Sequence, residues 1–245
     1  MSRTRHLLSF ILVAIAGAAL LAGCSDATRL NLRCVTGDLQ RCRQLGDMYA
    51  NGNGVRQDYA RAASLYERVC DAGVSEVCNR LGEIYEHVPG FDSEAKRVPD
   101  LYERACTAGS ANGCLNYGLA QASREEFAQA ALLFDRACIG GANGGCYQLA
   151  GAYQRGEGVS KDMARAIALY DQACSVDHVE SCLALAALYT EGADADVERD
   201  APRAAQYTAT AVRIYDEGCQ GGITSDCRER DKLKTRLARQ SAAGR

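Results

Sequence analysis

The sequence is short of the residue types that most often build metal and catalytic centres. Its 245 residues include only three histidines, and no Cys-x2-Cys pair occurs. Zinc sites need cysteine or histidine ligands at such short spacings. No arrangement of aspartate and serine around His87 or His178 suggests a catalytic triad. We therefore expect no metal, no cofactor and no catalytic residue.

The sequence also lacks an excess of positive charge. It holds 28 basic and 31 acidic residues, a net charge of −3. Residues 1–23 contain Arg3, Arg5 and no acid, so without them 26 basic and 31 acidic residues leave a net charge of −5. Nucleic-acid binding depends on basic surface that neutralises phosphates. The composition therefore does not favour a nucleic-acid partner, whereas 47% hydrophobic residues are enough to bury a core.

Cysteine, by contrast, is abundant and regularly placed. Twelve of the thirteen cysteines form pairs with seven residues between the two members: Cys34/Cys42, Cys70/Cys78, Cys106/Cys114, Cys138/Cys146, Cys174/Cys182 and Cys219/Cys227. The first cysteine of each pair recurs after 36, 36, 32, 36 and 45 residues. A period of this length is typical of a solenoid of helical hairpins. Each pair lies between the end of one expected helix and the start of the next, so we predict an all-α solenoid over residues 34–227.

We interpret the cysteine pairs as local disulfides, because their spacing is constant while the other segments change length. Disulfides in this number belong in an oxidising compartment. Closing a nine-residue loop contributes about 2.5 kcal/mol on the chain-entropy estimate. The alternative role is thiol–disulfide exchange, for which a short Cys-x-x-Cys motif is usual. Six equivalent pairs with seven intervening residues favour the structural role.

Residues 1–23 are typical of an export signal. A basic end precedes the apolar residues 7–20, a stretch shorter than the roughly 20 residues of a membrane span. It ends in Leu21-Ala22-Gly23-Cys24, which resembles the bacterial lipobox. The resemblance implies cleavage before Cys24, lipid on its thiol, and anchoring to the outer membrane on the periplasmic side, with residues 24–33 as anchor and linker. The alternative is an ordinary signal peptide with a free Cys24.

Two loops share one sequence pattern. Gly52, Gly54, Val55 and Asp58 recur as Gly156, Gly158, Val159 and Asp162. The glycines permit the positive φ of a helix end, and the aspartates can cap the following helix. Together with Leu-Gly and a tyrosine four residues after the leucine, the pattern resembles the Sel1-like repeat, a relative of the tetratricopeptide repeat. The cysteine pairs make it more similar to the Helicobacter cysteine-rich protein family. The resemblance implies about five helical hairpins in a right-handed α/α solenoid, with residues 228–245 as a polar capping helix and tail.

The fifth unit departs from the common period. It is nine residues longer than the 36-residue units, in a stretch that contains Glu191, Asp194, Asp196 and Glu198. Acidic residues without apolar periodicity are typical of loops. We therefore expect the additional residues to form a solvated loop.

The resemblance to tetratricopeptide units also implies a groove lined by the first helix of each hairpin. Such a groove suits an extended peptide, because polar side chains can bind its backbone and apolar ones its side chains. We therefore expect a monomeric scaffold that binds a protein or peptide. The expected groove residues are Arg43, Asp47, Asn79, Glu83, Asn112, Leu115, Tyr147, Gln154 and Leu183. Asn79 and Tyr147 should point away from the neighbouring hairpin and matter for binding but not for stability.

An enzymatic alternative rests on the resemblance alone, because the cysteine-rich family is associated with β-lactam binding and hydrolysis. Ser93 and Lys96 fit a Ser-x-x-Lys motif, and Ser110 and Asn112 fit a Ser-x-Asn motif. The third motif of penicillin-recognising enzymes, Lys-Thr-Gly, does not occur in the sequence. We expect Ser93 to cap a helix and Ser110 to lie in a turn between paired cysteines, so the scaffold is favoured.

Overall fold

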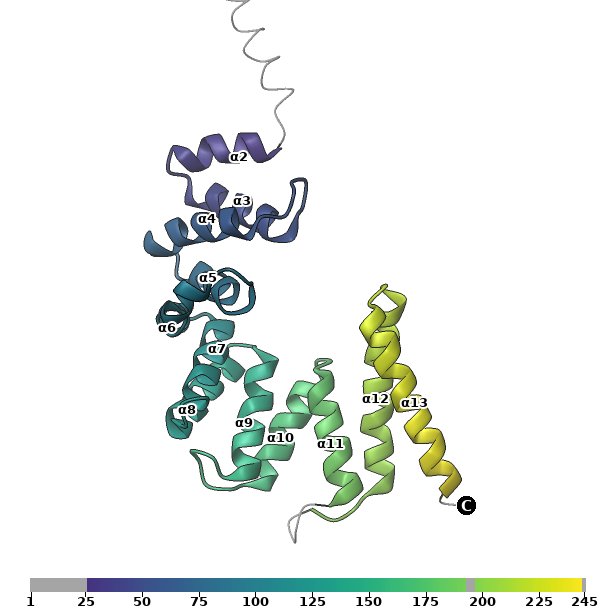
Figure 1. Cartoon of the computed structure of the whole chain (residues 1–245). Helices are drawn as coiled ribbons and strands as arrows, with labels where there is room; N and C mark the ends of the chain where they lie inside the picture. The colour runs from purple at the N-terminus through teal and green to yellow at the C-terminus, as the bar shows by residue number, and fades with distance from the viewer. Residues whose placement is uncertain (1–25, 193–196, 244–245) are drawn as a thin grey trace, which may run out of the picture. The chain divides into compact units, whose positions relative to one another are not determined.

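The computed structural model describes residues 26–192 and 197–243, and the described residues are helical with no β-strand (Figure 1). Residues 1–25, including Cys24, lie outside them. The elements are α2 (Asp26–Val35), α3 (Leu39–Asn51), α4 (Tyr59–Asp71), α5 (Glu76–His87), the 3-10 helix η1 (Asp92–Arg97), α6 (Val98–Thr107), α7 (Ala111–Ala122), α8 (Phe127–Ile139), α9 (Asn143–Arg155), α10 (Met163–Cys174), α11 (Val179–Glu191), α12 (Ala201–Gln220) and α13 (Thr224–Ala243). The expected all-α solenoid of helical hairpins is confirmed.

The chain divides into two compact units, and the division falls within α6, between Leu101 and Tyr102. The first unit contains α2 to α5 and η1, and the second contains α7 to α13. In each unit consecutive helices pack against one another, α3 on α4 in the first and α11 on α12 in the second among them. None of the described helices is both long and apolar enough to cross a membrane.

Six disulfides join the cysteines in the local pairs expected from the sequence. Each links the end of one helix to the start of the next, with Cα atoms 4.3 to 5.0 Å apart. The disulfides indicate an oxidising, extracytoplasmic compartment. The bonded pairs are Cys34 with Cys42, Cys70 with Cys78, Cys106 with Cys114, Cys138 with Cys146, Cys174 with Cys182, and Cys219 with Cys227.

The disulfides differ in their exposure. Ten of the twelve cysteines are buried, whereas Cys219 and Cys227 are partly exposed. The second cysteine of a pair lies near the start of its helix, and four of these are at most 1% exposed: Cys42 in α3, Cys78 in α5, Cys146 in α9 and Cys182 in α11. The inner disulfides are therefore part of the core of their hairpins, which agrees with a structural role.

Three of the hairpins are closed by the same group of side chains, which we call the Asp–Arg–Tyr clasp. In the clasp of α9 and α10, Asp162 caps α10 by accepting from the Arg165 backbone N–H at 3.0 Å. The Arg165 guanidinium contacts Asp162 and donates to the Tyr153 hydroxyl at 3.2 Å, with its central carbon 5.4 Å from the centre of that ring. Asp58, Arg61 and Tyr49 repeat this geometry in the first unit, and Asp200, Arg203 and Tyr189 repeat it between α11 and α12. The capping role expected for Asp58 is therefore present.

Both ends of the described chain contain more helix than the sequence suggested. Residues 26–33, expected to belong to an anchor and linker, form most of α2, which packs on α3 and buries Ala27. The last helix begins at Thr224, inside the last pair of cysteines rather than after it. Pro99 lies in the first turn of α6, where a missing backbone N–H costs no hydrogen bond.

The additional residues of the fifth unit form mainly helix, so the expectation that they form a loop was wrong for most of them. The described residues between α11 and α12 are not helical, and Asp194 and Asp196 lie outside the described residues. Tyr189 and Asp200 are eleven residues apart, whereas the matching residues of the other two clasps are nine apart. From Asp200 to Cys219 there are nineteen residues, whereas Asp58 to Cys70 and Asp162 to Cys174 span twelve. Two of the nine residues therefore extend the loop and seven extend α12. Seven residues make two helical turns, about 10 Å of length, and Figure 1 shows the α12–α13 turn extending beyond the N-terminal end of α11.

Candidate functional site

A cavity of about 550 Å³ lies among α11, α12 and α13 in the second unit. Its volume is in the range typical of ligand sites, roughly 300–1,000 Å³. Eleven residues line it: Leu183, Ala186, Ala187, Thr190 and Glu191 from α11, Thr208 and Tyr215 from α12, and Glu229, Lys232, Leu233 and Arg236 from α13. The α11 face is built largely of small side chains, which leaves space between the helices.

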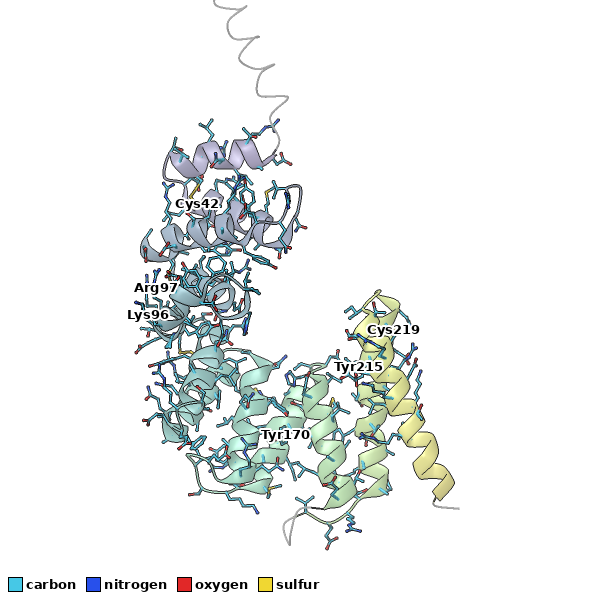
Figure 2. The ribbon with its side chains drawn as sticks, in the orientation of Figure 1. Cys42, Lys96, Arg97, Tyr170, Tyr215 and Cys219 are labelled. Atoms are coloured by element: carbon cyan, nitrogen blue, oxygen red, sulfur yellow. A yellow bond between two sulfur atoms is a disulfide. The ribbon has the colours of Figure 1, made fainter. Side chains whose placement is uncertain are left out.

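The two-turn extension of α12 explains why the cavity is present at this hairpin. Four residues before the first cysteine of their pairs, Tyr66, Phe134 and Tyr170 are buried against the preceding helix. A Cβ at Gly46 would lie only 2.6 Å from the Tyr66 ring, and one at Gly118 only 2.6 Å from the Phe134 ring. Tyr215 likewise lies four residues before the first cysteine of its pair, Cys219. The extension, however, places it two helical turns further from the start of α12 than the matching residues are from the start of their helices. It is only half-buried and lines the cavity (Figure 2).

The extension also repeats the buried face of α12. Ala204 and Ala211 are seven residues apart, and both are buried, as is Ala62 at the corresponding place in α4. Thr208 and Tyr215 are likewise seven residues apart, and both line the cavity. Because seven residues nearly complete two turns, α12 presents the same face over its extended length. The cavity is therefore part of a regularly packed hairpin.

The lining of the cavity combines an apolar floor with charged groups. Leu233 is buried, and Leu183 and Tyr215 are partly buried beside it. Lys232 Nζ pairs with Glu229 Oε1 at 2.6 Å, while the side chains of Glu191 and Arg236 form no ion pair with another described residue. Burial raises the pKa of the Tyr215 hydroxyl, and the negative charges of Glu180 and Glu229 raise it further. The Tyr215 hydroxyl is therefore a neutral hydrogen-bonding group at physiological pH.

Ion pairs hold α13 against α12 beside the cavity. Asp216 accepts from Lys234 Nζ at 3.1 Å and from Arg230 at 3.2 Å. These two cations, Lys234 first, hold the pKa of the Asp216 carboxyl below its usual value. The pairs are partly exposed, so each is a weak interaction and their number matters more than any one.

Leu183 is the expected groove residue that the structure places in the cavity, together with Ala187 one turn further along α11. Tyr147 and Gln154, from α9, belong instead to a half-buried cluster. The Tyr147 ring lies 5.6 Å from that of Tyr170 and 5.5 Å from that of His178, and Gln154 accepts from the Tyr170 hydroxyl at 3.0 Å. These contacts give Tyr147 a packing role that the sequence did not indicate.

In the first unit the expected groove residues mostly contact one another. Asp47 accepts from the Tyr66 hydroxyl at 2.7 Å and pairs with Arg80. Burial, followed by the hydrogen bond to Asp47, raises the pKa of Tyr66 to about 12. Arg43 lies 3.8 Å from Glu76 and is half-buried. Asp47 therefore ties α3 to α4 and α5.

The expectation that Asn79 faces an open groove was wrong. Its side chain is buried, at 5% exposure, and donates to Glu83 Oε1 at 2.7 Å. Asn112 is exposed in the first turn of α7, and Leu115 is half-buried against the Cys106–Cys114 disulfide. The rule that placed a groove residue directly after each second cysteine therefore selected partly buried positions in several repeats.

The second cysteines themselves are not part of the candidate site. Cys182 and Cys146 belong to clusters of buried residues inside the second unit. Cys42 and Cys78 are fully buried in the first unit. All four are bonded to their partners, so they hold the helices that carry the site and offer no thiol to a ligand.

A second hollow, of about 530 Å³, lies in the first unit. It is lined by Ala27, Thr28, Asn31, Leu45, Tyr49, Val55, Arg61, Ser64 and Leu65. Two of these, Tyr49 and Arg61, already bind each other in the clasp. This hollow serves as the comparison site in the experiment below.

Two serine arrangements bear on the enzymatic alternative. Ser93 lies within η1 rather than capping a helix, and its hydroxyl is 3.4 Å from Glu94. No hydrogen bond joins it to Lys96 in the described part of the chain. Ser110 caps α7 by accepting from the Gly113 backbone N–H at 3.1 Å. Neither hydroxyl has a contact that would activate it as a nucleophile.

His178 has serine and acid neighbours that the sequence analysis missed. Its Nδ1 lies 3.0 Å from Ser181 Oγ, and its Nε2 lies 3.6 Å from a Glu180 oxygen. Ser181 is fully buried, so its hydroxyl cannot reach a substrate from solution. The group sits at the start of α11, where polar side chains commonly satisfy a helix end.

Comparisons with known proteins agree with this fold. The Sel1 repeat family matches residues 42–74, 144–178 and 179–213. A Sel1 repeat protein from Oxalobacter formigenes is similar in structure, with a TM-score of 0.66 and 22% identity over 84% of this chain and 89% of that one. A Sel1 repeat protein from Klebsiella pneumoniae has a TM-score of 0.51 and 17% identity over 85% of this chain and 99% of that one. Immunity protein PA5088 from Pseudomonas aeruginosa has a TM-score of 0.52 and 16% identity over 76% of this chain and 71% of that one.

No curated protein sequence matches this chain. The structural identities are all below 25%, so these neighbours establish the fold alone. A function has to be argued from the side chains of this chain.

Proposed function

Because the chain is a Sel1 repeat protein, we propose that it is a non-catalytic scaffold that binds an extended segment of a protein partner in the cavity among α11, α12 and α13. The observation that carries the proposal is the cavity itself, about 550 Å³ in volume with an apolar floor and a charged rim. Helical-repeat surfaces commonly bind extended segments along their helix faces. One apolar side chain of the partner enters the cavity and supplies most of the binding free energy, as a buried anchor commonly does.

The charges at the rim define the rest of the ligand. Arg236 and Glu191 have no ion-pair partner among the described residues, and they line the same cavity from α13 and α11. A segment with an acidic residue on one side of its apolar anchor and a basic residue on the other would pair with both. We therefore assign a peptide with a central leucine, methionine or phenylalanine between opposite charges. Charge pairing of this kind contributes more to specificity than to affinity.

The proposal includes attachment of the scaffold to the bacterial envelope. It is supported by the sequence Leu21-Ala22-Gly23-Cys24 and by the disulfides, which require an oxidising compartment. Lipid on Cys24 would anchor the protein to the outer membrane, since several acyl chains bind a bilayer firmly. Growth with an alkyne analogue of palmitate tests this point. We expect the wild type to incorporate label and Cys24→Ala to lose both label and membrane attachment; label on Cys24→Ala would contradict it.

Peptide binding is measured with purified protein and fluorescein-labelled nonapeptides. Each peptide has a central leucine, an aspartate on one side and a lysine on the other, and both charge orders are made. We expect one order to bind, and replacement of leucine by alanine to weaken binding about thirtyfold, equivalent to about 2 kcal/mol. Ala187→Tyr, which fills the cavity, should weaken binding to a similar extent. Ala164→Tyr, at an exposed position of α10, is the matched control and should bind normally.

A charge exchange tests the assignment of the rim. Arg236→Glu should weaken binding of the aspartate peptide, and a peptide with lysine in place of aspartate should restore it. Arg61→Glu, in the hollow of the first unit, should have no effect. Equal affinities for Ala187→Tyr and wild type would remove the cavity from the proposal, and loss of binding in Arg61→Glu alone would place the site in the first unit.

A further inference from the structure

We propose that Cys219–Cys227 is a thiol–disulfide exchange site, at which a small or protein dithiol reduces this bond while the other five described disulfides stay oxidised. The five inner disulfides are inaccessible, because none of their ten cysteines is more than 7% exposed. Cys219 and Cys227 are both partly exposed. Exchange requires a thiolate to reach a sulfur atom, so accessible disulfides are the labile ones.

The extension of α12 accounts for this difference between the pairs. In the inner repeats, a side chain of a following helix covers the disulfide region: Arg136 of α8 donates to the Cys106 carbonyl at 3.0 Å, and Gln172 of α10 approaches Cys138 Sγ at 3.9 Å. The two additional turns carry Cys219 beyond the N-terminal end of α11 (Figure 2). Cys219 is contacted by Arg230 of α13, the helix to which its disulfide joins it, and no helix after α13 lies over it in the described part of the chain.

The charge beside Cys219 decides which sulfur is attacked. Arg230 places Nη1 3.3 Å from Cys219 Sγ, and the same side chain is held by Asp216 at 3.2 Å and Asp231 at 2.8 Å. A guanidinium stabilises negative charge that develops on a neighbouring sulfur. The better leaving thiolate departs faster in exchange. Cys219 is therefore the leaving group, and Cys227 Sγ is the atom that the incoming thiolate attacks.

The dithiol supplies both the electrons and the protons for the reduction. Its first thiolate forms a bond to Cys227 Sγ, the Cys219–Cys227 bond breaks, and the electron pair leaves on Cys219 as a thiolate. Its second thiolate then attacks its own sulfur in the mixed disulfide and releases Cys227 as a thiolate. The two protons given up by the dithiol pass, through solvent, to Cys219 and Cys227. The dithiol is oxidised by two electrons and the protein disulfide is reduced by two.

Reduction would also act on the cavity, and this part of the inference rests on the proposed function. Tyr215 lies four residues before Cys219, and Glu229 lies two residues after Cys227, and both line the cavity. Without the disulfide, the two helices remain joined near their turn by the exposed pairs of Asp216. We expect the reduced protein to bind the leucine peptide more weakly than the oxidised protein does.

The test follows reduction of the oxidised mature protein by dithiothreitol. Samples taken over time are alkylated with N-ethylmaleimide and mapped by mass spectrometry. We expect Cys219 and Cys227 to become labelled at least tenfold faster than any of the ten cysteines in the other five disulfides. Similar rates for all six pairs, or faster labelling of an inner pair, would overturn the proposal whatever the peptide measurements show.

The direction of attack is tested with glutathione and acid quenching. The mixed disulfide should form on Cys227, and a predominant adduct on Cys219 would refute the role of Arg230. Arg230→Gln should slow labelling of Cys219 and Cys227 severalfold. Arg68→Gln is the matched control, because Arg68 Nη1 lies 3.8 Å from Sγ of the buried Cys34, and it should leave the rate at Cys219–Cys227 unchanged. An unchanged rate in Arg230→Gln would also refute that role.

Discussion

The clasp between α9 and α10 predicts a specific loss of stability when Asp162 is replaced by alanine. Asp162 accepts a hydrogen bond from the Arg165 backbone N–H at 3.0 Å, and alanine removes this cap. Loss of such a cap typically costs about 1 kcal/mol. The ion pair between Asp162 and Arg165 adds little, because the Arg165 side chain is 66% exposed and the Asp162 side chain 36% exposed. Asparagine caps helices about as well as aspartate does, so Asp162→Asn should retain nearly all of the stability.

Hydrogen exchange followed by mass spectrometry is the suitable assay, because repeat proteins respond locally to a local change. A loss of about 1 kcal/mol corresponds to roughly a fivefold loss of protection, and we expect it in α10 of Asp162→Ala. Asp58→Ala and Asp200→Ala should give losses of similar size in α4 and α12, because each of these aspartates accepts a capping hydrogen bond from a backbone N–H at the same distance, 3.0 Å. If Asp162→Asn is as damaging as Asp162→Ala, the charge rather than the hydrogen bond is responsible, and the reasoning fails.

Three further outcomes follow from particular buried or half-buried residues. Burial raises the pKa values of Tyr66, Tyr170 and Tyr207 to about 12. Their unfolded value is about 10, so the unfolded chain loses these protons first and the free energy of unfolding falls as the pH rises from 10 to 12. A titration at 295 nm should show that Tyr170→Phe removes one tyrosine from the last group of hydroxyls to ionise. Gly46→Ala should cost about 1–3 kcal/mol, because its Cβ would lie 2.6 Å from the Tyr66 ring; an unchanged Tm would show that the ring can move. Tyr147→Ala should lower stability by about 1–2 kcal/mol through loss of its contacts with the Tyr170 and His178 rings; denaturant unfolding with an unchanged midpoint would instead support the sequence-based view that Tyr147 serves only binding.

The sequence predicted those features that repeat. The period of the cysteine pairs was enough to predict hairpins and local disulfides, and the recurring Gly-x-Gly-Val and Asp pattern predicted the helix end and the cap at Asp58. These features depend on local backbone geometry, so each copy of the motif repeats the signal.

The features that distinguish one repeat from another were harder to predict. The acidic residues that follow Glu191 led us to expect that all the additional residues of the fifth unit form a loop. Seven of these nine residues instead extend α12. The signal that could have been used is the spacing of Ala204 and Ala211 and of Thr208 and Tyr215, seven residues in each case. Asn79 was misplaced because its burial depends on packing between helices, which the spacing from a cysteine does not determine.

The seven-residue length of the extension limits how such a hairpin can change. Each residue turns a helix by about 100°, so seven residues return its buried face to within about 20° of the starting direction. An addition of five residues would rotate everything beyond it by about 140° and would turn Tyr215 and the last disulfide away from α13. Lengthening is therefore tolerated in steps of about two turns, and every step deepens the space beside α11 by about 10 Å. A protein designer could use this rule to set the depth of the cavity, because another seven residues in α12, matched by seven in α13, would enlarge the site without altering the clasp at Tyr189 or the pairing of the cysteines.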